Sequence, residues 1–301
     1  MERRPNTVGR AIAISILALL LFDFMGLIVK HLSPRYSAAE LSAYRNVFGL
    51  IPGIIALWTS AAWHERGRNL LIRQWKLAVM RGVAVTFAQF MFYLSLGLMA
   101  FATATSISYS SALFMTALSV PILGEKVGAI RWSAVAVGFV GVLWITQPGS
   151  DALGWQALLP IGAAALYAYS GVSARLIAED VPTPLLNLYS SGVAATGSIL
   201  LALALGEGSF TKIASAHDLL MIIMMGVFGG SAVLCLIVSF RMTEPSNLAP
   251  FSYLGIPIAF VFGWLFFDEA PFGDLFPGAI LIIAGGLFIV YRERALRRAQ
   301  G

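Results

Sequence analysis

The chain is short of charge, cysteine and histidine. Charged residues make up 12% of its 301 residues, against roughly 25% in ordinary soluble domains. The single cysteine, Cys235, excludes an internal disulfide and any site built from several cysteines. The three histidines lack metal-ligand spacing, and neither an HExxH nor a GxxxxGK[ST] motif occurs. The composition therefore predicts no metal site, no cofactor and no nucleotide-hydrolysing module.

Apolar sequence dominates instead, with 58% hydrophobic residues. Short links separate ten apolar stretches, each near the roughly 20 residues that a helix needs to cross a bilayer. The stretches are 11–30, 40–59, 77–97, 100–123, 131–147, 155–174, 184–205, 217–240, 246–267 and 273–291. We expect an all-α membrane protein with ten transmembrane helices.

The net charge of +5 does not indicate a nucleic-acid partner, because the basic residues follow a membrane topology. Most Lys and Arg residues lie on the side of the N-terminus, and only Lys30, Arg35 and Lys212 lie on the other. By the positive-inside rule, both termini are expected in the cytoplasm. The glycines at Gly49–Gly53 and Gly226–Gly230 have GxxxG spacing, which suits packing within the chain or a weak homodimer.

Two segments of the chain read as copies of one module. Ser95–Glu125 aligns with Ser239–Glu269, and the alignment places Tyr109 on Tyr253. The apolar stretches on either side align as well. The chain therefore divides into two related halves.

The halves are expected at 1–150 and 151–301, each a five-helix repeat. Because five spans is an odd number, the second half must enter the membrane with the opposite orientation. Inverted repeats of this kind place a substrate site near the bilayer midplane, where the halves meet.

Asp23 is the acidic residue deepest in an apolar stretch, and a carboxylate there costs roughly 2.5–3.5 kcal/mol on insertion scales. Three roles are open for it: binding a cationic group of a solute, titrating as a proton-coupling site, or pairing with Arg45 of the second span. Arg81 lies near the cytoplasmic end of the third span, where its side chain can snorkel to the interface.

Polar side chains also mark the third, fourth, sixth and ninth spans. Hydroxyl and aromatic groups on inward faces suit a flat or amphipathic organic solute, although Ser and Thr can also bond back to their own helix. The expected cavity-lining residues are Gln89, Tyr93, Ser106, Tyr109, Tyr167 and Tyr253. Glu125 and Glu269 end the fourth and ninth spans, where we expect each to cap the helix that follows.

The motifs resemble those of the drug/metabolite transporter superfamily, specifically its EamA-type members with ten helices in two repeats. The fourth and fifth spans read ATATSISYSSALFMTALSVPILGEKVGAIRWSAVAVGFVGVLWITQPG, and NLAPFSYLGIPIAFVFGWLFFDEAPFGDLFPGAILIIAGGLFIV echoes them. The arginine segment AYRNVFGLIPG and the segment DFMGLIVKHL are similar to the bacterial subgroup that contains S-adenosylmethionine and riboflavin carriers.

The resemblance implies a secondary transporter in the bacterial inner membrane that moves a small organic metabolite by alternating access. S-adenosylmethionine, riboflavin or an amino acid are the solutes that the resemblance suggests. A proton or a counter-substrate is the expected coupling partner, beside the lipid bilayer. The alternative is a membrane-embedded enzyme acting on lipid-linked substrates, in which the intramembrane polar residues would be catalytic.

Overall fold

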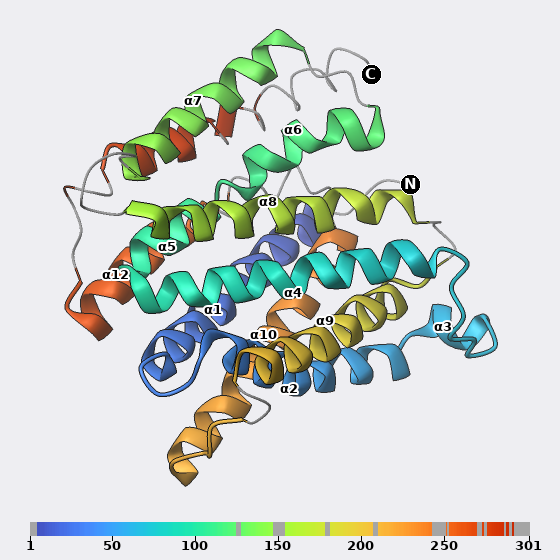
Figure 1. Cartoon of the computed structure of the whole chain (residues 1–301). Helices are drawn as coiled ribbons and strands as arrows, with labels where there is room; N and C mark the ends of the chain where they lie inside the picture. Colours follow the sequence, from blue (N-terminus) through green and yellow to red (C-terminus); the bar gives the residue numbers. More distant parts are fainter. Residues whose placement is uncertain are drawn as a thin grey trace.

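A computed structural model describes the molecule over residues 5–124, 128–146, 154–177, 181–206, 210–242, 251, 253–269, 273, 276–285, 287–288 and 291. Its regular elements within these ranges are helices (Figure 1). The first half contains α1 (Pro5–Leu32), α2 (Ala38–Trp58), α3 (Ala61–Glu65), α4 (Trp75–Leu98), α5 (Phe101–Ser108), α6 (Ser111–Leu123) and α7 (Ala129–Thr146). The second contains the 3-10 turns η1 (Gly154–Ala157) and η2 (Ala174–Leu176), with α8 (Leu158–Ser173), α9 (Thr183–Leu205), α10 (Ala216–Met242) and α12 (Gly255–Phe267).

Local sequence signals account for several helix ends. Ser37 and Glu40 form a capping box at the start of α2, each side chain accepting from the other's backbone N–H. Helix α6 stops at Gly124, whose φ of 68° places it in the left-handed region that glycine adopts without strain. Such signals fix where the spans begin and end.

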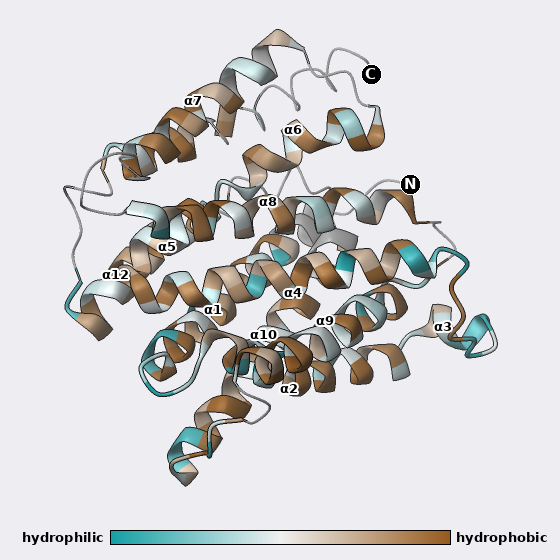
Figure 2. Cartoon of the chain, viewed as in Figure 1, coloured by the Kyte–Doolittle hydropathy of each residue, from teal (hydrophilic) through white to brown (hydrophobic). Residues whose placement is uncertain are grey.

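Hydrophobic residues, brown in Figure 2, dominate the helices. Among the described residues, six helical segments are long and apolar enough to cross a membrane, with Phe101–Leu123, which contains α5 and α6, counted as one. Val135–Ile145 and Gly255–Phe267 are shorter apolar helices. Large hydrophobic side chains face outward along the bundle, among them Ile55, Leu143 and Leu265. A soluble protein rarely exposes so much contiguous apolar surface, so the chain is an all-α membrane protein. The expected count of ten crossings stays a prediction.

Helices of the two halves pack in mirrored pairs. α1 packs on α10, and its mirror pair is α4 on α8; α2 packs on α10, and its mirror pair is α4 on α9. Helices α2 and α9 pack on each other, as do α5 and α12. This is the arrangement expected of two repeats related by a two-fold axis, and it leaves α1, α4, α8 and α10 to line the interior between the halves.

The fourth span is interrupted near its middle by a turn at Tyr109 and Ser110, between α5 and α6. In the ninth span, a turn at Tyr253 and Leu254 precedes α12. The two tyrosines that the repeat aligns therefore both lie in turns. Discontinuous spans are a common source of solute-binding groups in transporters with inverted repeats.

Candidate functional site

Asp23 lies inside the bundle on α1, with 3% of its surface exposed. Its Oδ2 has no hydrogen-bond partner, and the carboxylate forms no ion pair with any residue that the structure describes. Tyr109 lies within electrostatic reach of it. One turn further along α1, Gly26 packs against the ring of Phe101 on α5, so Asp23 lies at the depth of the hydroxyl-rich fourth span.

Pairing with Arg45 was one of the three roles open for Asp23, and this pair does not form among the described residues. Arg45 donates instead from Nη2 to the carbonyl of Gly229 on α10 at 3.2 Å, and from Nη1 to Asn46 Oδ1 at 2.9 Å. Because Gly229 has no side chain, the guanidinium of Arg45 can approach the α10 backbone closely. A backbone carbonyl thus takes the role that sequence reasoning gave to the carboxylate.

The hydroxyl groups of the spans divide into two sets. Some bond back to their own helix, such as Thr86 to the carbonyl of Gly82 at 3.0 Å and Ser119 to that of Thr116 at 2.9 Å. Others are buried without a partner: one is Ser190 on α9, and the other four lie on α5 and the turn after it, Thr105, Ser106, Ser108 and Ser110. Since a buried unpaired hydroxyl costs free energy, this cluster has hydrogen bonds left for a group that the protein does not supply.

Tyr109 connects this cluster to the second half. Its hydroxyl lies against Gly255 at the start of α12, so closely that a Cβ at Gly255 would overlap it. Tyr253, two residues earlier, is buried at 5% exposure. Both tyrosines therefore lie where α5, α6 and α12 meet.

Gln89 belongs to a buried polar network rather than standing free. Its Oε1 accepts from Asn46 Nδ2 at 2.6 Å and from Ser42 at 3.4 Å. The Asn46 amide also donates to Ser198 Oγ at 3.2 Å and to the carbonyl of Ala194 at 3.3 Å. The network joins α2, α4 and α9. Sequence reasoning missed Asn46, although a second polar residue directly after Arg45 was a visible signal.

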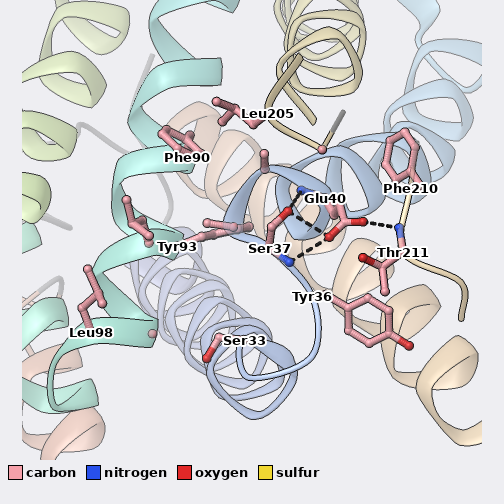
Figure 3. A pocket seen from close by; sticks show the side chains of 15 residues that line it. Ser33, Tyr36, Ser37, Glu40, Phe90, Tyr93, Leu98, Leu205, Phe210 and Thr211 are labelled. Atoms are coloured by element: carbon pink, nitrogen blue, oxygen red, sulfur yellow. Dashed lines mark hydrogen bonds between the residues drawn. The ribbon is translucent and has the colours of Figure 1, made fainter. Parts of the chain in front are cut away.

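A cavity of about 530 Å³ opens near the α1–α2 link, beside α4 and the segment before α10 (Figure 3). Ser37, Glu40 and Thr211 line its polar side, with Glu40 accepting from the Thr211 backbone N–H. Nearby, Asp218 is fully buried and accepts from Arg35 and Tyr36 at 2.9 and 2.8 Å. Of the expected cavity-lining residues, this cavity reaches only Tyr93.

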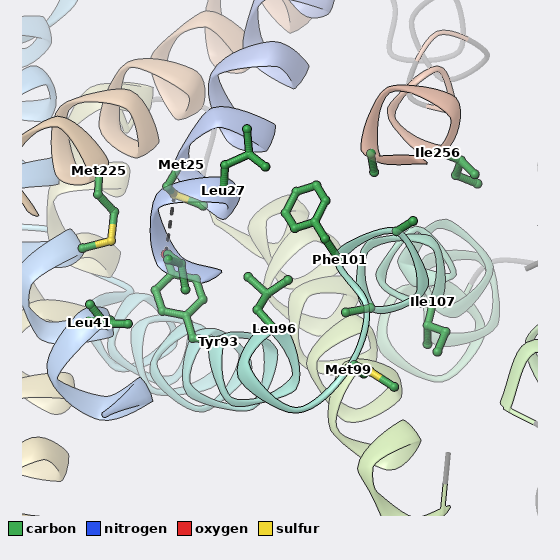
Figure 4. Packing of buried hydrophobic residues seen from close by; sticks show 14 of the residues in the cluster. Met25, Leu27, Leu41, Tyr93, Leu96, Met99, Phe101, Ile107, Met225 and Ile256 are labelled. Carbon is green, nitrogen blue, oxygen red and sulfur yellow. Dashed lines mark hydrogen bonds between the residues drawn. The ribbon is translucent and has the colours of Figure 1, made fainter. Parts of the chain in front are cut away.

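Tyr93 is the contact between α4 and α1. It is 1% exposed and donates to Met25 Sδ at 3.5 Å, within the main hydrophobic cluster (Figure 4). Tyr167 on α8 lies within electrostatic reach of both Tyr93 and Arg45. Tyr93 and Tyr167 therefore lie near each other, between α4 and α8.

Arg81 is more enclosed than a snorkelling side chain would be. Its Nε and Nη1 are buried by protein and have no hydrogen-bond partner. Tyr169 on α8 is its electrostatic neighbour. Arg81 is therefore half-buried, with two donors that protein covers and no described group accepts from.

Four residues form a cluster, here called the clamp, that joins the end of α1, the start of α5 and the segment after α12. They are Lys30, Met99, Phe101 and Glu269. Lys30 Nζ lies 2.8 Å from Glu269 Oε1 and donates to the Met99 carbonyl at 2.8 Å. Glu269 Oε2 accepts from the Phe101 backbone N–H at 2.9 Å. Glu269 thus caps α5 of the first half, where the sequence predicted a cap on the next helix. Glu125 lies outside the described residues.

Histidine, cysteine and acidic side chains form no group of three that could hold a metal ion in the described part of the chain. The buried polar groups instead include the carboxylate of Asp23, hydroxyl groups, tyrosine rings and the guanidinium of Arg45. Such a lining can bind an organic solute through charge, hydrogen bonds and stacking.

Comparison with known proteins gives relatives across nearly the whole chain. An S-adenosylmethionine uptake transporter of Rickettsia prowazekii is 25% identical over 93% of this chain and 92% of its own. A riboflavin transporter of Rhizobium johnstonii is 32% identical, over 58% of this chain and 57% of its own. Human solute carrier family 35 member G1 is 26% identical over 97% of this chain and 82% of its own.

A solved crystal structure has the same fold, with a TM-score of 0.65 at 20% identity over 96% of this chain and 99% of that one. The model of the EamA-like transporter family matches the chain twice, at residues 9–147 and 154–291. The chain belongs to the EamA-like transporter family.

Proposed function

We propose that this protein is a secondary transporter that moves a small organic solute by alternating access between the halves 1–150 and 151–301. The mirrored packing of helices supports this mechanism, because each half can take up the conformation of the other. The protein would lie in the bacterial inner membrane with both termini in the cytoplasm, as a monomer or weak homodimer. A proton or a counter-substrate would drive the cycle.

The solute site is proposed at Asp23, Ser106 and Tyr109. The observation that carries this proposal is the cluster of buried, unpartnered polar atoms at the break in the fourth span, beside the unpaired carboxylate of Asp23. A ligand that supplied hydrogen-bond partners would remove several desolvation costs at once. Tyr253 would close the site from the second half.

The remaining residues would shape this site. Gln89 is held by Asn46, and Tyr93 by Met25, so both present fixed surfaces to the interior. Tyr167 would form an aromatic wall with Tyr93. Rigid walls of this kind favour a planar or amphipathic solute, and the relatives named for S-adenosylmethionine and riboflavin supply the first compounds to test.

Uptake into proteoliposomes tests the proposal. Labelled S-adenosylmethionine and riboflavin are offered to vesicles containing the wild-type protein, and the compound recovered inside is identified chemically. Recovery of unchanged compound supports a transporter, whereas chemical conversion would favour a membrane-embedded enzyme. Binding without any accumulation inside the vesicles would overturn the proposal.

Asp23→Asn is the decisive variant, because it keeps the shape of the side chain and removes its charge. We expect uptake to fall at least about tenfold, the factor that corresponds to about 1.4 kcal/mol of lost interaction. Asp268→Asn is the matched control, since Asp268 is an exposed acid at the end of α12. Wild-type rates in Asp23→Asn would remove Asp23 from the site.

A further inference from the structure

The charged groups within the spans are nearly all paired inside the protein. Lys30 pairs with Glu269, and Asp218 with Arg35. Glu40 accepts from backbone N–H groups, and Arg45 donates to a backbone carbonyl. Four buried atoms of charged side chains in the described spans have no partner: Asp23 Oδ2, Arg45 Nε, and Nε and Nη1 of Arg81. Because Arg45 uses its other two donors, two side chains of opposite sign remain as exceptions.

The exceptions are Asp23 on α1 and Arg81 on α4. Asp23 Oδ2 and both Nε and Nη1 of Arg81 are buried without hydrogen-bond partners, and no ion pair joins the two residues. An unpaired ionisable group inside a membrane protein is costly and is usually functional. Each of these groups therefore needs a partner of opposite charge, and the described protein does not provide one.

The two groups lie on neighbouring helices at different depths. Helices α1 and α4 are in contact and run in the same direction, because one span, α2, separates them. The bond from Tyr93 to Met25 fixes their relative height. With a helical rise of 1.5 Å per residue, Asp23 lies roughly 3 Å before Met25 and Arg81 roughly 18 Å before Tyr93. Asp23 and Arg81 thus differ in depth by about 15 Å, less the reach of the arginine side chain.

We infer that the solute is dipolar, with a cationic group received by Asp23 and an acidic group received by Arg81. The inference rests on the proposed transport function and narrows its substrate class. A solute with both charges neutralises both groups in one binding event, whereas a singly charged or uncharged solute leaves one or both unpaired. Guanidinium binds carboxylate or phosphate through paired N–H donors, so the acidic group is one of these two.

The snorkelling alternative makes a different demand on Arg81. A lipid phosphate at the interface would need the guanidinium donors open to the surrounding membrane, but protein covers Nε and Nη1. Tyr169 on α8 lies close to the same group. Arg81 as a whole is half-buried, and the two unpartnered donors, Nε and Nη1, lie on its protein-covered side.

A first experiment measures thermal stability without any ligand. Asp23→Asn and Arg81→Gln each remove an unpaired charge, so each purified variant is expected to unfold at the wild-type temperature or about 2–4 °C above it. Arg73→Gln, which removes an exposed arginine from the link before α4, is the control and is expected to change nothing. A clear fall in the unfolding temperature of Asp23→Asn or Arg81→Gln would reveal a partner within the protein and overturn the inference.

A second experiment compares three probes in proteoliposome uptake. S-adenosylmethionine carries cationic groups and a carboxylate, decarboxylated S-adenosylmethionine lacks only the carboxylate, and riboflavin carries no charge at neutral pH. We expect the wild-type protein to prefer the first over the second by at least about tenfold. Arg81→Gln should abolish this preference and Arg81→Lys should restore part of it, while Asp23→Asn should slow both sulfonium compounds.

The outcomes separate the inference from the function on which it rests. Uptake of riboflavin without either sulfonium compound keeps the transporter and overturns the dipolar solute. Equal uptake of the two sulfonium compounds by the wild-type protein also overturns it. Uptake of none of the three counts against the proposed function, and the stability of the two charge-neutral variants then decides on the dipolar solute by itself.

Discussion

The clamp formed by Lys30, Met99, Phe101 and Glu269 should contribute measurably to stability, and two substitutions of one residue can divide its contribution. Glu269→Gln removes the charge that faces Lys30 but keeps an oxygen that can accept from the Phe101 N–H. Glu269→Ala removes both interactions. The difference between the variants therefore measures the helix cap separately from the ion pair.

The exposures of the two charged side chains set the expected magnitudes. Lys30 is 12% and Glu269 30% exposed, which places their pair between exposed pairs of about 0–1 kcal/mol and buried pairs that cost about 3–5 kcal/mol to break. We expect Glu269→Gln to cost about 1 kcal/mol. Losing a hydrogen bond to a charged acceptor adds about 1.5–3 kcal/mol, so Glu269→Ala should cost about 3 kcal/mol.

Thermal unfolding of the purified protein in detergent provides the assay. At roughly 2–4 °C per kcal/mol, the unfolding temperature should fall by about 2–4 °C in Glu269→Gln and by about 6 °C or more in Glu269→Ala. Asp268→Asn serves as the control, because this neighbouring acid is exposed and its φ of 54° suits asparagine.

Two results would refute this reasoning. Wild-type unfolding temperatures in both Glu269 variants would mean that the ion pair and the cap contribute nothing. Equal losses in the glutamine and alanine variants would mean that the Phe101 N–H bond has no separate value.

Two further predictions concern packing within the spans. Gly255→Ala should lower the unfolding temperature because the new Cβ overlaps Tyr109. The same substitution should have little effect in a Tyr109→Ala background. If the changes in unfolding temperature caused by the two substitutions simply add in this double-mutant cycle, the contact is contradicted. Asn46→Ala removes four hydrogen bonds, three donated by Nδ2 and one that Oδ1 accepts from Arg45. At about 0.6 kcal/mol each, the loss should cost about 2.4 kcal/mol. An unchanged unfolding temperature would show that the Gln89 network is not structural.

Sequence reasoning succeeded where a property is local. The apolar stretches predicted the helices that the described residues show, at least in part, at all ten positions. The contact of Arg45 with Gly229 was not foreseen, because the backbone of α10 becomes available only through the absence of a side chain at Gly229. Such a contact depends on how two distant helices pack, and no spacing along the chain encodes it.

The same limit applies to the cap formed by Glu269. An acid at the end of a span predicts a cap, but the free backbone N–H nearest to it belongs to Phe101 in the other half. The prediction that Glu269 caps a helix was correct, but the helix that it caps is α5 and not the one that follows it. The roles of Gln89, Tyr93 and Tyr167 in solute binding stay predictions.

The mirrored pairing of helices has a consequence for the energy of the transport cycle. If the second half adopts the conformation of the first, the seam of α1 with α10 exchanges its geometry with that of α4 with α8. The packing lost at one seam is then regained at the other, and the two end states have similar free energies. A small difference between the solute's affinities for the two end states is then enough to shift their populations.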